Sequence, residues 1–283
     1  MTFLSKNISI KNSIAYVRYL LQVLMRESVV KMTKEIQLEA NERIDQLYAN
    51  EIKIIQSAEV FSFSLDAVLL ADFAHPVLKQ KGKIVDLCAG NGAVGLFLTK
   101  KTRAQITEVE IQPRLIDMAK RSIELNDLTA QVNTLNIDLK DIFHQFRKDS
   151  VDTVTCNPPY FANEPTSKKN PNPYLALARH ESTASLADII EVISGLLKMG
   201  GKMYMVHRPE RLQEIFSLLA KNRLVPKRIR LVYPKAGREA NMVLIEAIKD
   251  GNPGGLRFIP PVTVYDEQDE YLPEVKRVLY GTE

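Results

Sequence analysis

The feature that most constrains the fold is an alternation of short apolar runs with amphipathic helical periods from residue 83 onward. Such an alternation is typical of βαβ units, which form a parallel sheet with helices on both faces. The predicted strands are 83–88, 105–111, 131–137, 151–157 and 201–207, the predicted helices 93–101, 112–126, 186–197 and 209–221, and residues 228–234 and 241–248 form a closing antiparallel hairpin. We therefore expect an α/β fold with a doubly wound, mostly parallel seven-stranded sheet.

Length and composition place the chain in the ordinary globular class. With 283 residues, 45% of them hydrophobic and 25% charged, it can bury a core in one large domain or two small ones. No apolar run approaches the ~20 residues of a spanning helix, which argues against a membrane protein. We expect a leader with a helical extension at 1–50, one α/β domain at 51–249 and a C-terminal tail at 250–283. The leader is compatible with a transit peptide, a peripheral membrane helix or an over-extended start before Met32.

Cysteine usage and charge give further expectations. Cys88 and Cys156 are too few for a disulfide framework and lack the spacing of a metal site, so we expect reduced thiols, a cytoplasmic protein and no metal. The net charge is +4, and residues 1–31 carry an excess of four positive charges, so the rest of the chain is neutral overall. A nucleic-acid partner must therefore be argued from the positions of the charges.

A glycine-bearing turn, DLCAGNGAVG at 86–95, stands where the first predicted strand of the α/β domain passes into a helix. Gly90, Gly92 and Gly95 satisfy the G-x-G-x-x-G pattern of nucleotide-binding turns. Glu110 follows Gly90 by twenty residues, at the end of the next strand, where a carboxylate can bind ribose hydroxyls. Taken alone, this turn also fits an NAD oxidoreductase.

A second motif follows the fourth predicted strand. It places Asn157, Pro158, Pro159 and Tyr160 at the carboxyl edge of the sheet, where open α/β folds bind ligands. An exocyclic amine is a poor nucleophile because its lone pair is delocalised. The Asn157 side chain and the Pro158 carbonyl can accept its N–H groups, the prolines fix the backbone, and Tyr160 offers a ring on which a flipped base stacks. This chemistry favours methyl transfer to an amine over hydride transfer.

With these motifs the chain resembles class I S-adenosylmethionine-dependent methyltransferases of the N-P-P-Y amino type over about 51–249. Within that group, FSFSLDAVLLADFA at 61–74, NPPYF at 157–161 and ARHES at 178–182 are similar to bacterial valine-tRNA adenine-N6 methyltransferases. The resemblance implies a Rossmann-like methyltransferase domain, S-adenosylmethionine as cofactor, and tRNA as partner, methylated at the adenosine just 3′ of the anticodon.

The resemblance also implies roles for particular residues. The catalytic residues would be Asn157, Pro158, Pro159 and Tyr160, and the cofactor-binding residues Asp66, Asp86, Cys88, Gly90, Gly92, Glu110, Asp138 and Asn157. Glu110 would bind the ribose and Asp138 the adenine, although Asp141 can exchange with Asp138 in that role. Cys88 stands where the superfamily usually has its first glycine. Ser64 and Asp66 equally fit the start of a helix, as an N-cap and a first-turn acid.

Seven basic residues with no acid among them lie between Lys221 and Arg238, and Lys168 and Lys169 follow the NPPYF motif. Such runs suit phosphate contacts, although a charge run is also typical of a solvated face. We expect RNA binding by Lys168, Lys169, Lys227, Arg228 and Arg230. His180 is expected to have a structural or RNA-contacting role.

Several alternatives stay open at this point. A protein glutamine-amide methyltransferase and a ribosomal guanine-N2 methyltransferase share the chemistry of the N-P-P-Y face. From other classes, an NAD oxidoreductase and a non-catalytic RNA-binding module fit parts of the pattern. The predicted strand order also places Cys88 and Cys156 on neighbouring strands, with Cα atoms within about 12 Å of each other.

Overall fold

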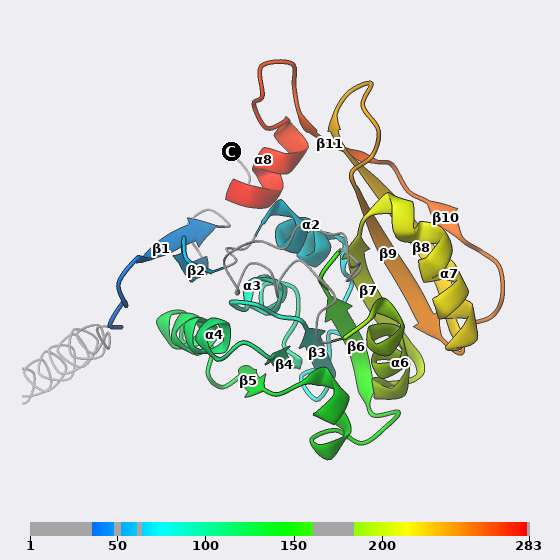
Figure 1. Cartoon of the computed structure of the whole chain (residues 1–283), viewed down its shortest axis with the longest axis horizontal. Helices are drawn as coiled ribbons and strands as arrows, with labels where there is room; N and C mark the ends of the chain where they lie inside the picture. Colours follow the sequence, from blue (N-terminus) through cyan, green and yellow to red (C-terminus); the bar gives the residue numbers. More distant parts are fainter. Residues whose placement is uncertain (1–35, 48–51, 61–63, 161–183, 282–283) are drawn as a thin grey trace, which may run out of the picture. The chain divides into compact units, whose positions relative to one another are not determined.

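The computed structural model describes residues 36–47, 52–60, 64–160 and 184–281. The chain divides into two compact units, 1–37 and 38–283. Nearly all of the first unit, and with it most of the predicted leader, lies outside the described residues. The second unit holds the sheet (Figure 1).

The second unit is built on a mixed sheet with nine strands in the described residues, in the order β10-β8-β9-β7-β6-β3-β4-β5, with β11 also pairing with β8. The strands are β3 (Lys83–Leu87), β4 (Gln105–Glu110), β5 (Val132–Asn136), β6 (Val151–Cys156), β7 (Leu197–His207), β8 (Leu224–Lys235), β9 (Met242–Lys249), β10 (Arg257–Phe258) and β11 (Val262–Tyr265). The five strands β5, β4, β3, β6 and β7 are mutually parallel, while β9 is antiparallel to both β7 and β8. The predicted doubly wound, mostly parallel α/β sheet is confirmed, and its strand order reverses beside β3. The sheet has nine strands in the described residues where seven were expected, because β10 and β11 of the predicted tail also join it.

Helices cover both faces of this sheet (Figure 1). They are α2 (Leu65–Phe73), α3 (Ala93–Leu98), α4 (Pro113–Leu125), α6 (Leu186–Leu196), α7 (Leu212–Lys221) and α8 (Pro273–Tyr280), with short 3-10 turns η1 (Leu139–His144) and η2 (Pro209–Arg211). Pro113 opens α4, where a missing N–H costs nothing, and Ser185 caps α6 in a capping box with Asp188.

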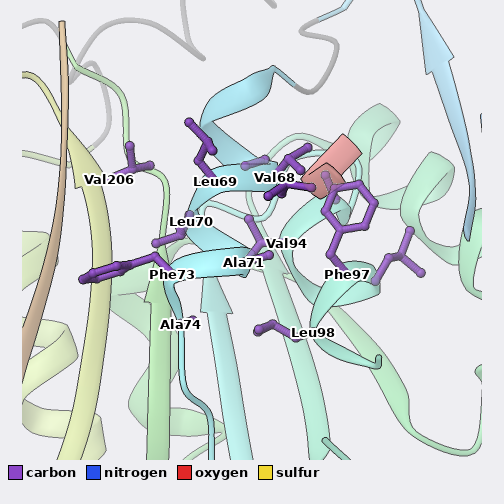
Figure 2. Packing of buried hydrophobic residues seen from close by; sticks show 14 of the residues in the cluster. Val68, Leu69, Leu70, Ala71, Phe73, Ala74, Val94, Phe97, Leu98 and Val206 are labelled. Atoms are coloured by element: carbon purple, nitrogen blue, oxygen red, sulfur yellow. The ribbon is translucent and has the colours of Figure 1, made fainter. Parts of the chain in front are cut away.

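The buried apolar residues form two clusters, which take alternate residues of the central strands. Ile84 and Tyr204 belong to the cluster that includes residues of α2, α3 and α8, whereas their neighbours Val85 and Met203 belong to the cluster with α6 and α7. Figure 2 shows part of the first cluster, in which α2 side chains and Phe97 of α3 pack above the strands. This alternation is what a strand buried on both faces requires.

Two additions border the predicted domain. An antiparallel hairpin of β1 (Glu42–Leu47) and β2 (Ile52–Ser57) is joined to α4 by the ion pair of Glu42 with Arg121. At the other end, β10 and β11 run parallel to β8, and α8 packs on α2. Residues 250–281 therefore belong to the same compact unit as the sheet.

Candidate active site

A pocket lies at the carboxyl ends of β3, β4 and β6, beside the reversal of strand order where α/β folds bind ligands. It is lined by Ala67, Cys88, Ala89, Gly90, Asn91, Ala93, Val94, Val109, Glu110, Ile111, Gln112, Leu115, Ile137, Asp138, Leu139, Asn157, Pro159, Ala184 and Ile189. The structure thus gathers Cys88, Gly90, Glu110, Asp138 and Asn157 around one space, as the sequence predicts.

The glycine-bearing turn owes its shape to three left-handed residues. Gly90 has φ +58° and Gly92, at the start of α3, has φ +85°. A Cβ at Gly92 would also come within 2.6 Å of Glu108 Oε2, so this position needs glycine for space as well as conformation. Cys88 adopts φ +56°, a glycine-like conformation that costs a residue with a side chain roughly 1–2 kcal/mol. The cysteine therefore preserves the turn geometry of the glycine it replaces.

Glu110 closes the turn from the neighbouring strand. Its Oε2 accepts the Gly90 N–H at 2.9 Å and its Oε1 accepts the Gln112 N–H at 3.0 Å. Burial raises the pKa of this carboxyl despite these bonds, which favour its charged form. Each carboxylate oxygen keeps a lone pair after accepting one bond, so Glu110 can hold the turn and still accept a diol.

A third wall comes from the segment after β5. Asp138 caps η1 by accepting the Lys140 N–H at 3.0 Å, and it lines the pocket between Ile137 and Leu139. Asp141 is 63% exposed on its side chain and is not among the lining residues. Of the two carboxylates left open by the sequence, Asp138 is the one at the pocket. The apolar wall of the pocket, which includes Ile111, was not predicted. Apolar residues nevertheless flank both Glu110 and Asp138 in the sequence.

The N-P-P-Y motif follows β6 directly. Asn157 and Pro159 line the pocket, whereas Pro158 and Tyr160 do not. The Tyr160 hydroxyl lies 2.5 Å from Asp66 Oδ2 and 2.8 Å from Asn157 Oδ1. Burial and the nearby Asp66 charge raise the pKa of Tyr160 well above its usual value, so its hydrogen stays on the phenol.

Asp66 is the residue whose position differs most from its predicted role. We expected it at the cofactor, but its carboxylate binds Tyr160, and its neighbour Ala67 lines the pocket instead. Asp66 is a first-turn acid of α2, as the alternative interpretation required, while Ser64 makes no capping bond with its side chain. Asp66 therefore lies against Tyr160 of the N-P-P-Y motif and outside the lining of the pocket, and its contact with the cofactor stays a prediction.

Two buried carboxyl groups lie beneath the turn. Asp86 is the register partner of Glu108 on β4, and its Oδ1 accepts the Thr155 hydroxyl at 2.6 Å. Burial raises the pKa of Asp86 to about 7 and that of Glu108 well above its usual range. Neither Glu108 oxygen has a hydrogen-bond partner within the described part of the chain. Asp86 therefore supports the turn from below rather than lining the pocket, and the sequence reasoning did not identify Glu108.

The two cysteines are neighbours, as the strand order predicts. Leu87 of β3 is the register partner of Cys156 on β6, and Cys88 follows Leu87 directly in the chain. Both cysteines are free, Cys156 is buried and Cys88 lines the pocket. Burial and the Cys88 thiol raise the pKa of Cys156.

The predicted RNA-binding residues of β8 are engaged within the protein. Lys227 donates to the carbonyl groups of Asn252 and Gly254, Arg228 pairs with Glu246, and Arg230 pairs with Glu274 and Asp72. Only 11% of the Arg228 side chain and 14% of the Arg230 side chain are exposed. These contacts tie the three side chains to other parts of the fold, and RNA binding by these residues stays a prediction.

The physical reason is that the acids which pair with these arginines lie elsewhere in the sequence. Glu246 on β9 and Glu274 on α8 are far from these arginines in the sequence, and only the fold brings them next to β8. The other predicted residues, Lys168 and Lys169, lie outside the described residues, as does His180.

Within the described residues, no three histidine, cysteine, aspartate or glutamate side chains gather as metal ligands do. In the same ranges, no helix combines the length and apolar character needed to cross a membrane.

The fold and the pocket define an α/β enzyme of the doubly wound, nucleotide-cofactor-binding class. Within that class, a model of the methyltransferase small domain matches residues 51–222, and the chain belongs to that family. The family uses S-adenosylmethionine as cofactor, and the residues lining the pocket fit it: a carboxylate for a diol, a glycine turn, and apolar walls beside Asp138.

Curated relatives carry a more specific name, "tRNA1(Val) (adenine(37)-N6)-methyltransferase". The protein from Shewanella sediminis is 27% identical over 57% of this chain and 65% of its own length. The protein from Shewanella halifaxensis matches over 62% of its own length. The protein from Shewanella baltica (strain OS195) is 23% identical over 73% of this chain and 85% of its own length. The protein from Bacteroides fragilis (strain YCH46) is 26% identical over 64% of this chain and 74% of its own length. The chain thus spans less than two thirds of the first two relatives.

Solved structures agree on the fold. A predicted O-methyltransferase of Agrobacterium tumefaciens has a TM-score of 0.58 at 24% identity and covers 75% of this chain and 94% of its own. TYW2 of P. horikoshii, solved with MeSAdo, has a TM-score of 0.53 at 15% identity over 76% of this chain and 74% of its own.

Proposed function

We propose that this protein methylates the exocyclic N6 of an adenosine in tRNA, and that the target is the adenosine beside the anticodon of valine tRNA. The observation that carries the proposal is that Asn157 and Pro159 line the same pocket as Gly90 and Glu110. The amine-binding motif therefore adjoins the cofactor-binding turn. The names of the relatives support tRNA adenine as the substrate.

The cofactor would be held by residues of this chain with separate tasks. Glu110 would accept the ribose hydroxyls, Asp138 would accept from the adenine amine, and Ile137 and Leu139 would cover the ring. When bound, S-adenosylmethionine supplies a methyl group on a positively charged sulfur.

The N-P-P-Y residues would orient the nucleophile. The Asn157 side-chain oxygen and the Pro158 carbonyl would each accept one N–H of the adenine amine, so that its lone pair points toward the cofactor. Orientation and exclusion of water would supply most of the acceleration. His207, the histidine beside Tyr160, is neutral and its Nδ1 already accepts the Arg208 N–H at 2.8 Å. It is therefore not needed as a base, because an amine attacks without losing a proton first.

The remaining predictions belong to this proposal or are set aside. A cytoplasmic location remains part of it, based on the two free thiols. Membership of a methyltransferase family disfavours the NAD oxidoreductase and the non-catalytic RNA-binding module. The glutamine-amide and guanine-N2 activities become outcomes of the test.

The test uses purified protein, labelled S-adenosylmethionine and unmodified valine-tRNA transcripts, followed by mass spectrometry of the nucleosides. We expect N6-methyladenosine from the natural transcript and none when guanosine replaces the target adenosine. Asn157→Ala should lower turnover at least roughly a hundredfold while affinity for S-adenosylhomocysteine stays within a few-fold, since Asn157 acts on the transition state. Labelling of ribosomal guanine or of protein glutamine, with tRNA unlabelled, would contradict the proposal.

A further inference from the structure

A group of polar side chains with unmet hydrogen-bonding capacity lies beside Tyr160. It is formed by His207 and Arg208 at the end of β7 and by Asn241 just before β9. Because β9 is antiparallel to β7, with His207 paired to Val243, these residues share the sheet edge that carries the N-P-P-Y motif. His207 Nε2, Arg208 Nε and Asn241 Oδ1 are all buried without a hydrogen-bond partner in the described ranges.

Arg208 is the charged member of this group. Its Cζ lies 5.6 Å from the centroid of the Tyr160 ring, and the His207 ring centroid is 5.3 Å from the same ring. Of the five N–H donors of a guanidinium, only Nη1 has a described partner, the Asn241 carbonyl at 2.8 Å. The side chain is partly exposed, so a ligand can reach it.

Three other arginines of this half of the sheet are paired with carboxylates. Arg211 pairs with Glu214, Arg228 with Glu246 and Arg230 with Glu274. Arg208 has no carboxylate within ion-pairing distance among the residues that the structure describes. Its neighbour His207 adds no charge above acidic pH, because burial and the positive charges of Arg211 and Arg208 lower its pKa to about 4.

We propose that Arg208 binds a phosphodiester group of the substrate RNA next to the methylated nucleotide. This inference rests on the proposed function. A base that reaches Asn157 must leave its stack and lie against Tyr160, and its backbone then passes the rim of the pocket. A guanidinium fixed against the same ring by the Asn241 carbonyl presents its free donors there. Phosphate is the anion that matches the fork of a guanidinium and accompanies every nucleotide.

Its contacts also distinguish Arg208 from the paired arginines of β8. Arg228 stacks on Phe73 with Cζ 4.7 Å from the ring centroid and is neutralised by Glu246, so its contacts are complete within the fold. Arg208 makes a similar contact with an aromatic ring but lacks the neutralising acid. The missing counter-charge is what a bound phosphate would supply.

The experiment compares Arg208→Gln, Arg208→Lys and a matched control, Arg103→Gln. Arg103 is exposed and precedes β4, at the opposite edge of the sheet. Binding of unmodified valine-tRNA transcript is measured by fluorescence anisotropy at several salt concentrations. S-adenosylhomocysteine affinity by calorimetry and the melting temperature report whether each variant is folded.

We expect Arg208→Gln to weaken tRNA binding about tenfold and to reduce the slope of log K against log salt by about 0.7–1, the loss of one phosphate contact. KM for tRNA should rise by a similar factor while kcat changes little. Arg208→Lys should keep the slope but recover only part of the affinity, because lysine lacks the fork. Arg103→Gln should match the wild type.

Three results would overturn the inference. The first is an unchanged salt slope and affinity in a folded Arg208→Gln variant. The second is an equal loss in Arg103→Gln, which would indicate a general charge effect. The third is a fall in kcat at unchanged KM, which would indicate a role in orienting Tyr160. A wild-type protein that binds tRNA through Arg208 without methylating it would refute the proposed function alone.

Discussion

The hydroxyl of Tyr160 lies 2.5 Å from Asp66 Oδ2 and 2.8 Å from Asn157 Oδ1, so two acceptors face a single hydroxyl hydrogen. In the proposed function, the same Asn157 oxygen accepts an N–H of the substrate amine. A charged acceptor forms the stronger hydrogen bond. Asp66 therefore draws the phenolic hydrogen away from Asn157 and leaves the Asn157 oxygen available.

The first prediction follows from this competition. Asp66→Ala should lower kcat for tRNA methylation by about tenfold, because the Tyr160 hydroxyl then bonds Asn157 alone. Tyr160→Phe should stay near wild-type activity, since it keeps the ring and removes the competing hydrogen. The double variant should regain the activity of Tyr160→Phe. Single-turnover rates at saturating S-adenosylmethionine measure this.

The double variant distinguishes orientation from structure. If Asp66 acts only by stabilising α2 or by binding the cofactor, removing the Tyr160 hydroxyl cannot restore activity. A double variant as slow as Asp66→Ala would therefore rule out the competition. Asn157→Ala is the reference for complete loss of the acceptor.

The second prediction concerns Glu110, which holds the Gly90 and Gln112 N–H groups. Glu110→Gln should weaken S-adenosylhomocysteine binding by about 1.5–3 kcal/mol, because a charged acceptor for the diol is lost. The melting temperature of the unliganded protein should fall by a few degrees, because the amide has one acceptor oxygen for the two N–H groups that the carboxylate accepts. Calorimetry that finds equal affinity would remove Glu110 from the cofactor site.

The third prediction concerns Glu108, which is buried beside Asp86. Its raised pKa means that the folded state keeps a proton that the unfolded state releases above about pH 4.5. Wild-type stability should therefore fall, relative to Glu108→Gln, as the pH rises from 4.5 toward the folded-state pKa, by about 1.4 kcal/mol per pH unit. Below pH 4.5 the difference between the two proteins should be constant. Urea unfolding at a series of pH values measures this, and a constant difference throughout would contradict it.

Sequence alone predicted those features that depend on order along the chain. The turn at Gly90 and Gly92, the acid at Glu110 and the motif at Asn157 each follow a strand, and parallel strands bring their carboxyl ends to one edge. The left-handed conformation of Cys88 was not predicted, because a cysteine at this position left the geometry of the turn open. The predicted motifs are local in sequence, so their positions can be predicted without knowledge of the long-range contacts.

Features that depend on side-chain direction, or on partners distant in the sequence, could not be predicted. The pattern could place Asp66 at the start of a helix but could not show that its carboxylate reaches Tyr160, ninety-four residues away. Arg228 and Arg230 looked like a patch because acids distant in sequence, Glu246 and Glu274, neutralise them only in the fold. Arg208 was not identified from the sequence, because it does not belong to a run of basic residues.

The last prediction concerns Cys88 and Cys156. Cys88 lines the pocket, whereas Cys156 is buried and its pKa is raised by burial and by Cys88, so its thiolate is scarce. N-ethylmaleimide should therefore label the folded protein at Cys88 alone and inactivate it by filling the pocket. Bound S-adenosylhomocysteine should slow both labelling and inactivation. Cys88→Ser should resist inactivation, while Cys156→Ser should remain sensitive. Peptide mass spectrometry of the folded and the denatured protein locates the label. Labelling of Cys156 in the folded protein, or inactivation that bound S-adenosylhomocysteine does not slow, would show that Cys88 is not the reactive thiol at the cofactor pocket.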